Sequence, residues 1–70
     1  MRRERVTSSS IAAIGYDPDT RTMEVEFHNT GVYRYTDVPA AVHRRFLRAD
    51  SHGRFFNDHI RDRYTTTRLA

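Results

Sequence analysis

The residues of this chain that could do chemistry are mainly its arginines. The 70 residues include twelve arginines, no lysine and nine acids, which gives a net charge of +3. Guanidinium groups make planar, two-pronged contacts with phosphates, so an arginine-rich face without neighbouring acids is typical of nucleic-acid binding. Three arginines share one side of a helix predicted between residues 38 and 49, where no acid occurs. We expect this face to bind RNA, either tRNA or a single strand. The residues assigned to the interface are Arg34, Arg44, Arg45, Arg48 and Arg61.

Tyr33 and Tyr35 flank Arg34 in a short predicted strand, and this pattern has two interpretations. Aromatic side chains interleaved with basic ones can form a platform on which nucleobases stack. Two aromatic residues at alternate positions of a strand can equally be ordinary core, because alternate side chains share one face. Which interpretation holds depends on the direction in which the tyrosines point.

The loop before this strand decides that direction. A two-residue loop of residues 29–30 would place Tyr33 opposite Glu26, on the solvent face. A three-residue loop that ends at Gly31 would instead pair Phe27 with Tyr33, and Glu26 with Arg34. Glycine adopts the positive φ that the third position needs, so we prefer the second register. It predicts that both tyrosines mainly face the core and that their hydroxyls reach its edge.

Catalysis and metal binding have little support in the sequence. There is no cysteine, and the serines lie in an N-terminal segment or at a predicted helix start, where no base is placed beside them. His52 and His59 are seven residues apart, whereas zinc-binding helices use spacings of about three to five. We therefore expect no enzyme activity, no metal and no cofactor.

The strands that position these residues follow from the hydrophobic pattern. Residues 21–28 alternate apolar and polar side chains, which is typical of a half-buried strand. Residues 11–16 and 32–36 complete a predicted three-stranded antiparallel meander with one apolar face. A turn at residues 17–20 would pair Ile14 with Met23. A sheet of this size needs a cover, so helices should pack on that face.

Two helices are predicted to form this cover, which makes the fold class α+β. Asp37 is the expected N-cap of the first helix, with Pro39 in its first turn, and this helix ends near residue 49. Ser51 is the expected N-cap of the second helix, which should reach residue 63 or 64. Asn57 would lie beside its buried stripe and bond to backbone. The residues expected to build this helix and its contacts with the sheet are Tyr33, Tyr35, Gly53, Phe56, Asn57, Ile60 and Tyr64.

The chain is long enough for one domain. We expect a flexible lead-in at residues 1–8, a single domain at residues 9–64 and a tail at residues 65–70. Neither a signal peptide nor a membrane anchor is visible, so the default expectation is a soluble cytoplasmic protein.

The order and spacing of several short motifs resemble the KTSC domain, a small bacterial module named for its occurrence at the C-terminus of some lysyl-tRNA synthetases. The resemblance extends over residues 9–69, and the module also occurs as a free-standing protein. Its attachment to a synthetase implies RNA binding. The matching residues are Ile14-Gly15-Tyr16, Tyr33-Arg34-Tyr35, Val38-Pro39, Ser51, Gly53, Phe56-Asn57, Ile60-Arg61 and Tyr64.

The alternative function is a module for protein–protein interaction or homo-oligomerisation. Ile11, Ala13 and Val32 are expected on the outer face of the sheet, and Phe55 at the flank of the second helix. A three-stranded sheet also leaves two edges open for pairing. Small domains often need a partner to complete their core.

Overall fold

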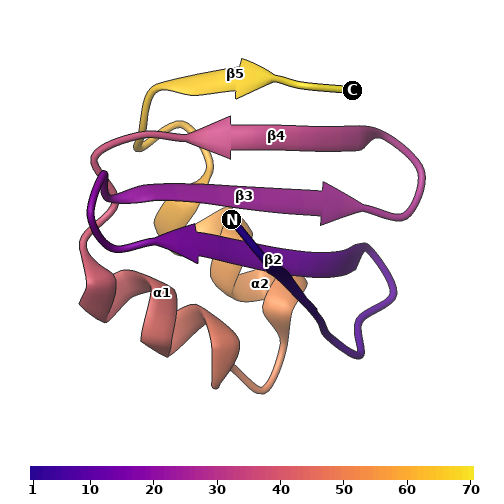
Figure 1. Cartoon of the computed structure of the whole chain (residues 1–70). Helices are drawn as coiled ribbons and strands as arrows, with labels where there is room; N and C mark the ends of the chain where they lie inside the picture. The colour runs from indigo at the N-terminus through magenta and orange to yellow at the C-terminus, as the bar shows by residue number, and fades with distance from the viewer.

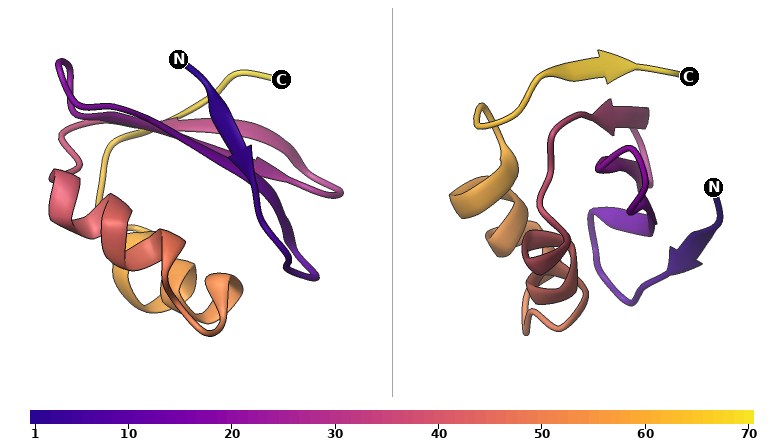
Figure 2. Two further views of the ribbon diagram at one scale, coloured as in Figure 1. Left: turned by 60° about the horizontal axis from the view of Figure 1, so that its bottom comes forward. Right: turned by 60° about the vertical axis from the view of Figure 1, so that its left-hand side comes forward.

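Five antiparallel strands form one sheet in the order β1-β2-β3-β4-β5 (Figure 1). The computed structural model describes residues 1–70. Three helical segments follow β4 and lie together on one face of the sheet (Figure 2). The α+β class and the central meander are confirmed, but the predicted number of three strands is wrong. The elements are β1 (Arg3–Arg5), β2 (Ile11–Asp17), β3 (Thr22–Phe27), β4 (Gly31–Tyr35), α1 (Ala40–Leu47), α2 (His52–Phe55), the π-helix η1 (Phe56–Ile60) and β5 (Thr66–Arg68).

The two additional strands are β1 and β5, which form the edges of the sheet. Strand β1 pairs with β2, where Arg3 lies opposite Gly15, and β5 pairs with β4, where Thr66 lies opposite Tyr35. Both strands have three exposed residues. A segment this short and polar has no hydrophobic alternation, so periodicity could not reveal it. They lie in the segments expected to be the lead-in and the tail.

The hairpin between β3 and β4 keeps the predicted face of the tyrosines but not their predicted partners. Tyr33 lies opposite Val25, and Tyr35 lies opposite Met23. Each partner is two residues from the expected one, because the loop occupies residues 28–30 and Gly31 begins β4. A shift of two residues leaves every side chain on its face. The positive φ expected at Gly31 is confirmed, at 108°.

The hairpin between β2 and β3 shows the same shift and also a β-bulge. Ile14 lies opposite Val25 rather than Met23, and the pairing is irregular between Ile11 and Ala13. A bulge opposes two residues to one, so it changes the face on which the preceding residue lies. Ile11 therefore belongs to the core and is fully buried, which corrects its expected position on the outer sheet face.

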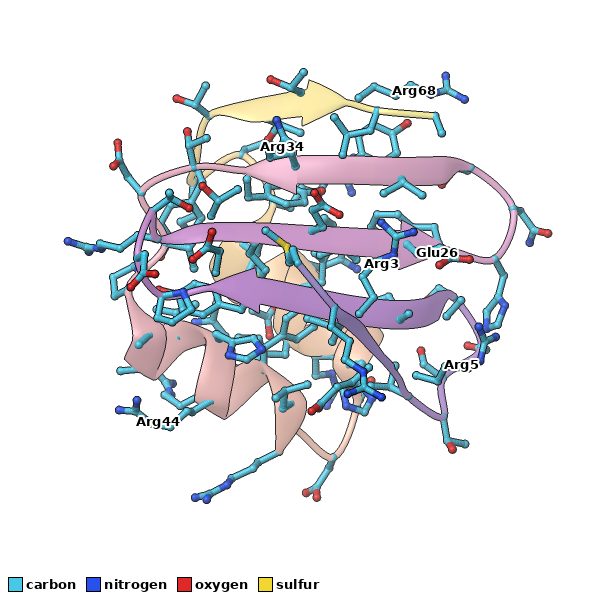
Figure 3. All side chains as sticks on the ribbon, viewed as in Figure 1. Arg3, Arg5, Glu26, Arg34, Arg44 and Arg68 are labelled. Carbon is cyan, nitrogen blue, oxygen red and sulfur yellow. The ribbon has the colours of Figure 1, made fainter.

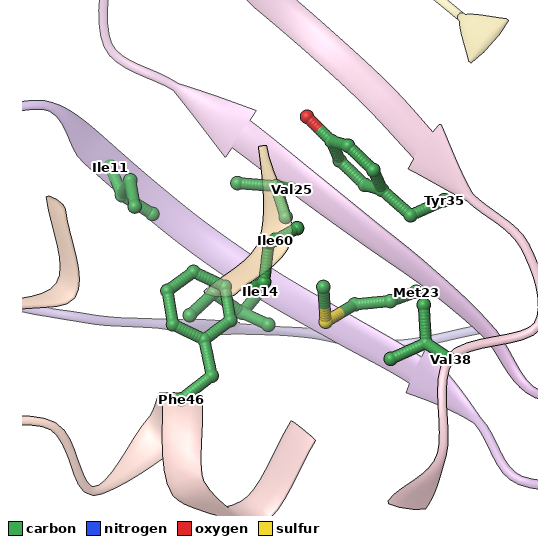
Figure 4. Packing of buried hydrophobic residues seen from close by; sticks show 8 residues of the cluster. All are labelled: Ile11, Ile14, Met23, Val25, Tyr35, Val38, Phe46 and Ile60. Carbon is green, nitrogen blue, oxygen red and sulfur yellow. The ribbon is translucent and has the colours of Figure 1, made fainter. Parts of the chain in front are cut away.

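The core lies between the sheet and the helices (Figure 4). Its eight residues are at most 4% exposed. The hydroxyl of Tyr16 donates a hydrogen bond to the carbonyl oxygen of Val38 at 2.5 Å, so this carbonyl near the start of α1 has a partner. The cluster comprises Ile11, Ile14, Met23, Val25, Tyr35, Val38, Phe46 and Ile60.

The helices are short, and none is long and apolar enough to cross a membrane. Helix α1 begins after Pro39, so the prediction that Asp37 is its N-cap is wrong. Asp37 has a φ of 59° and turns the chain before the helix, and the Val38 amide then donates to the carbonyl of Arg21 at 2.9 Å. The predicted N-cap of the second helix is confirmed, because the Ser51 hydroxyl accepts from the Arg54 amide at 3.2 Å.

The second helix departs from its prediction at its C-terminal half, where η1 replaces the α-helical turns. The amide of Arg61 donates to the carbonyl of Phe56, five residues earlier, at 2.8 Å. The wider turn keeps Ile60 fully buried, but it leaves the side chain of Asn57 exposed and without a hydrogen bond. The expected backbone bond of Asn57 is therefore wrong, and the helical segment ends at Ile60 instead of residue 63 or 64. Tyr64 follows it and packs against the core.

Candidate nucleic-acid interface

Helix α1 and its C-cap residue present three exposed arginines, Arg44, Arg45 and Arg48, which we call the α1 arginine face. None of them forms an ion pair with an acid. Arg44 and Arg45 lie in the last turn, where the helix dipole favours positive charge. The Arg45 guanidinium also lies 5.5 Å from the centre of the Phe55 ring, which holds it against α2. The face thus offers charge that the protein itself does not neutralise.

Arg34 does not belong to this face. It lies on the outer surface of the sheet together with Arg3, whereas Arg44 lies on α1 (Figure 3). A carboxylate oxygen of Glu24 is 2.8 Å from Arg3, and the other is 3.4 Å from Arg34. Glu24 is only 8% exposed, so this carboxylate is buried between two guanidinium groups. The positive charge of Arg34 is therefore largely neutralised by Glu24.

Arg61 lies in a third place, after η1 and beside a groove on the helix side of the sheet. Its guanidinium is 3.9 Å from the carboxylate of Asp62, and both side chains are mostly exposed. The five arginines predicted as one interface therefore occupy three separate regions, and only those of α1 form a continuous group. Helical spacing could find this group, but the sequence alone could not place Arg34 and Arg61 relative to it.

The groove beside Arg61 has a volume of about 550 Å³ and four aromatic side chains in its lining. Phe27 packs edge-to-face against Tyr33 and against Phe56, at ring-centre distances of 5.7 and 5.2 Å. Phe56 in turn packs edge-to-face against Tyr35 at 5.8 Å. We call it the aromatic groove. The alternation of Tyr33 and Tyr35 was the only sign of the aromatic groove in the sequence. The opening of the groove depends on where the helices end, which the sequence did not reveal.

Tyr35 is only 4% exposed as a residue, and its hydroxyl has no hydrogen-bond partner in the protein. No buried side-chain polar atom is left unpaired, so this hydroxyl is open to solvent. Its side chain lines the aromatic groove, and its hydroxyl end points away from Met23 and Val38 (Figure 4). Burial, together with the nearby Tyr33, raises the pKa of Tyr35 to about 12. Tyr35 is therefore a neutral phenol at neutral pH, with a hydroxyl that can donate into the groove.

His43 lies on α1 beside the arginines but adds little charge to them. Its ring stacks on the ring of Tyr16, with centres 4.6 Å apart. Burial lowers the pKa of His43, the charge of Glu4 opposes this shift, and the charge of Arg44 adds to it. The net direction is downward, so the imidazole is neutral at pH 7. The positive charge of this region comes from the α1 arginine face.

The surfaces considered for a protein partner are smaller than the sequence indicated. Ile11 is fully buried and Ala13 is 2% exposed. Phe55 is half-buried beneath the Arg45 guanidinium and stacks on Phe46 at a ring-centre distance of 5.5 Å. The edges of the sheet are now the short strands β1 and β5.

One solved structure and several sequenced proteins are similar to this chain over most of its length. A KTSC domain protein from Yersinia pestis, known from its crystal structure, is 40% identical and superposes with a TM-score of 0.97, covering 99% of this chain and 97% of that one. An uncharacterised protein from Stutzerimonas stutzeri is 47% identical over 57 residues, which is 81% of this chain and 80% of the relative. A protein from Tsukamurella paurometabola is 38% identical over 91% of this chain and 96% of its own length.

A lysine–tRNA ligase from Nostoc is also similar, with 32% identity over 62 residues. The match covers 89% of this chain but only 11% of that enzyme. The model of the KTSC domain family matches residues 7–64. The family match, the nearly identical fold and the similarity to uncharacterised relatives agree, and the chain belongs to the KTSC domain family.

Proposed function

We propose that this protein binds RNA through the α1 arginine face. The observation that supports this is the set of three exposed arginines on one short helix, none of which is paired with an acid. Uncompensated positive charge on a surface attracts polyanions, and guanidinium groups bind phosphates with two parallel hydrogen bonds. The other two regions fit this role less well, because Arg34 and Arg61 both have carboxylate neighbours.

The relationship to a lysine–tRNA ligase supports RNA as the polyanion. About a tenth of the Nostoc enzyme is similar to this chain, and that enzyme acts on a tRNA. A small basic module attached to such an enzyme would hold the RNA by its backbone rather than read its sequence. Backbone contacts determine affinity and position, whereas base contacts determine specificity.

The salt dependence of the affinity reports the number of contacts between arginines and phosphates. Three arginines on a single strand predict a slope of log K against log salt of about −2. Binding should then weaken by roughly 20-fold between 50 and 200 mM salt. An apolar interaction would show almost no such dependence.

The test is a fluorescence titration of a labelled single-stranded RNA, and of a tRNA pool, across this salt range. The variant Arg44→Gln with Arg48→Gln removes two charges of the face, and Arg45 is kept because it packs on Phe55. The matched control is Arg2→Gln with Arg5→Gln, which removes the same charge from exposed arginines without an ion pair. We expect the α1 variant to flatten the slope by about 1.4 and the control to change it little.

Two results would contradict the proposal. One is the absence of saturable binding by the wild-type protein at 50 mM salt. The other is an equal loss of binding in both double variants, which would mean that only net charge matters. Circular dichroism melting of each variant separates a lost contact from a lost fold.

A further inference from the structure

The aromatic groove contains a polar group for which the protein supplies no partner. Tyr35 is more than nine-tenths buried as a residue, and its hydroxyl forms no hydrogen bond within the protein. Because no buried side-chain polar atom is left unpaired, this hydroxyl is open to the groove, where water or a ligand can reach it. A hydroxyl that the protein leaves free at a groove can exchange a water partner for a polar atom of a ligand. The groove volume of about 550 Å³ also lies within the range of small-molecule sites. The hydroxyl and the cavity together indicate a ligand site.

We propose that the aromatic groove binds one unstacked nucleobase of a single-stranded nucleic acid. This inference deepens the proposed function, since it rests on RNA as the ligand class. It is nevertheless a separate site from the α1 arginine face, with its own residues and its own test. Stacking on aromatic side chains contributes about 1–3 kcal/mol per base, and it tolerates any base.

The charges at the groove favour a ring over a free anion. The only charged side chains in its lining are Arg61 and Asp62, which lie 3.9 Å apart and have opposite signs. Their fields largely cancel, so the site does not concentrate phosphate as the α1 arginine face does. A second guanidinium, that of Arg68, lies 5.8 Å from the centre of the Tyr33 ring, where it is held by the π face.

The polar groups of the lining favour a heteroaromatic ring over an aliphatic side chain. Four of the eight lining residues are polar or charged, and two of the four aromatic ones are tyrosines. A nucleobase carries donors and acceptors around its edge and an apolar π face. It can therefore pack on the aromatic rings while Tyr35 donates to a ring nitrogen or carbonyl. Hydroxyls of Thr30 and Thr66 also lie in the lining.

The first experiment compares adenosine 5′-monophosphate with ribose 5-phosphate by amide chemical-shift mapping. The two probes differ by the base alone. We expect the nucleotide to shift the resonances of Tyr33, Tyr35, Phe56 and Thr66, and ribose 5-phosphate to leave them in place. Equal shifts from both probes, or shifts confined to α1, would overturn the proposal. N-acetyl-tyrosinamide is the third probe, and tighter binding of this peptide mimic than of the nucleotide would also overturn it.

A matched pair of variants tests the unpaired hydroxyl. Tyr35→Phe removes the hydroxyl that has no protein partner, whereas Tyr16→Phe removes one that is bonded to Val38. Loss of one neutral hydrogen bond weakens binding by roughly 3- to 10-fold. We expect that loss of nucleotide affinity for Tyr35→Phe and no change for Tyr16→Phe. Equal affinity of Tyr35→Phe and wild type would contradict the assigned role.

Failure of this site and failure of the α1 arginine face have different signatures. Single-stranded RNA with one abasic position in every three would bind more weakly if bases enter the groove. The α1 double variant would show a flatter salt slope on both intact and abasic RNA. If the α1 double variant flattens the salt slope but abasic positions do not weaken binding, the groove is rejected and the α1 arginine face is kept. If abasic positions weaken binding but the double variant leaves the salt slope unchanged, the face is rejected and the groove is kept.

Discussion

The hydroxyls of Tyr16 and Tyr35 have different surroundings, and stability should depend on them differently. Tyr16 donates to the Val38 carbonyl, while the Tyr35 hydroxyl has no protein partner and is open to solvent. A hydrogen bond contributes about 1 kcal/mol, and a carbonyl that loses its donor adds to the cost. We expect Tyr16→Phe to lower the free energy of unfolding at pH 7 by about 1–2 kcal/mol. Tyr35→Phe should change it by less than about 0.5 kcal/mol.

The stabilities of wild type and Tyr35→Phe should also differ in alkali, because the pKa of Tyr35 is raised to about 12 in the folded protein. When the pKa of an acid is higher in the folded state, its contribution to stability is fully present at any pH below its pKa in the unfolded chain, which is near 10. That contribution is lost as the pH rises through the pKa of the folded state. Between pH 10 and pH 12 the wild type should therefore lose stability that Tyr35→Phe keeps, at about 1.4 kcal/mol per pH unit. Urea titrations at pH 9, 10 and 11 measure this, and parallel curves for both proteins would contradict it.

At the scale of residues, the sequence predicted the exposure of the α1 arginine face correctly and that of Asn57 incorrectly. The arginines follow a regular α-helical spacing, which the structure keeps in α1. Asn57 lies in η1, where one extra residue per turn rotates the side chains away from their expected directions. No sequence pattern marked this π-helix. Stacking of nucleobases on Tyr33 and Tyr35 was one interpretation of the sequence, but the groove itself could not be predicted, since it opens where η1 ends.

At the scale of elements, strand β1 depends on the absence of a side chain at Gly15. A Cβ at this position would lie 2.8 Å from Cγ of Arg3 and 3.0 Å from the backbone oxygen of Arg2. The backbone oxygen cannot rotate aside, so the strand itself must move. We expect Gly15→Ala to displace β1, break the pair between Arg3 and Glu24, and lower stability by about 1–3 kcal/mol. Faster amide hydrogen exchange throughout residues 3–5 is the measurement.

Gly53→Ala is the matched control for this change. A Cβ at Gly53 would meet only the Oγ of Ser10, at 2.9 Å, which is the end of a side chain and not backbone. A serine hydroxyl can rotate away, and alanine is about 1 kcal/mol more favourable than glycine within a helix. Gly53→Ala should therefore leave exchange in β1 unchanged. Protection of β1 that is equal in wild type and Gly15→Ala would show that the strand tolerates the methyl group.

The central elements were predictable from the sequence because their hydrophobic patterns are long enough to define a face. The face of Tyr33 and Tyr35 is right, since a register shift of two residues preserves it. The burial of Ile11 could not be predicted, because a bulge changes the face of a strand without a marker in the sequence. Strands β1 and β5 form through backbone pairing with a neighbour, and no local pattern announces that.

At the scale of the whole molecule, carboxylates neutralise part of the positive charge on the sheet, whereas the α1 arginine face has no ion pair. On the sheet, Arg3 and Arg34 share Glu24, and Arg3 also lies 3.6 Å from Glu26. This division permits a small, mildly charged protein to offer a local site for a polyanion.

The edges of the sheet complete this picture, because β1 and β5 cover strands that would otherwise be open to pairing. Strand β2 begins with four consecutive buried apolar residues, Ile11–Ile14, whereas β4 contains the exposed Arg34. An exposed apolar edge promotes association between chains, and short charged edge strands such as β1 suppress it. We therefore expect a chain of residues 7–70, which lacks β1, to self-associate. A chain of residues 1–64, which lacks β5, should associate less.

Sedimentation velocity at several protein concentrations compares both shortened chains with the full chain. Both should also unfold more easily, by about 2 kcal/mol or more, because each loses several backbone hydrogen bonds. If the chain of residues 7–70 sediments as the full chain does, then β1 is not what keeps β2 from pairing. If the chain of residues 1–64 associates more strongly instead, the exposed side chains of β4 matter more than the length of apolar edge. The comparison thus tests whether the apolar edge of β2 or the exposed side chains of β4 determine how readily this sheet pairs with other chains.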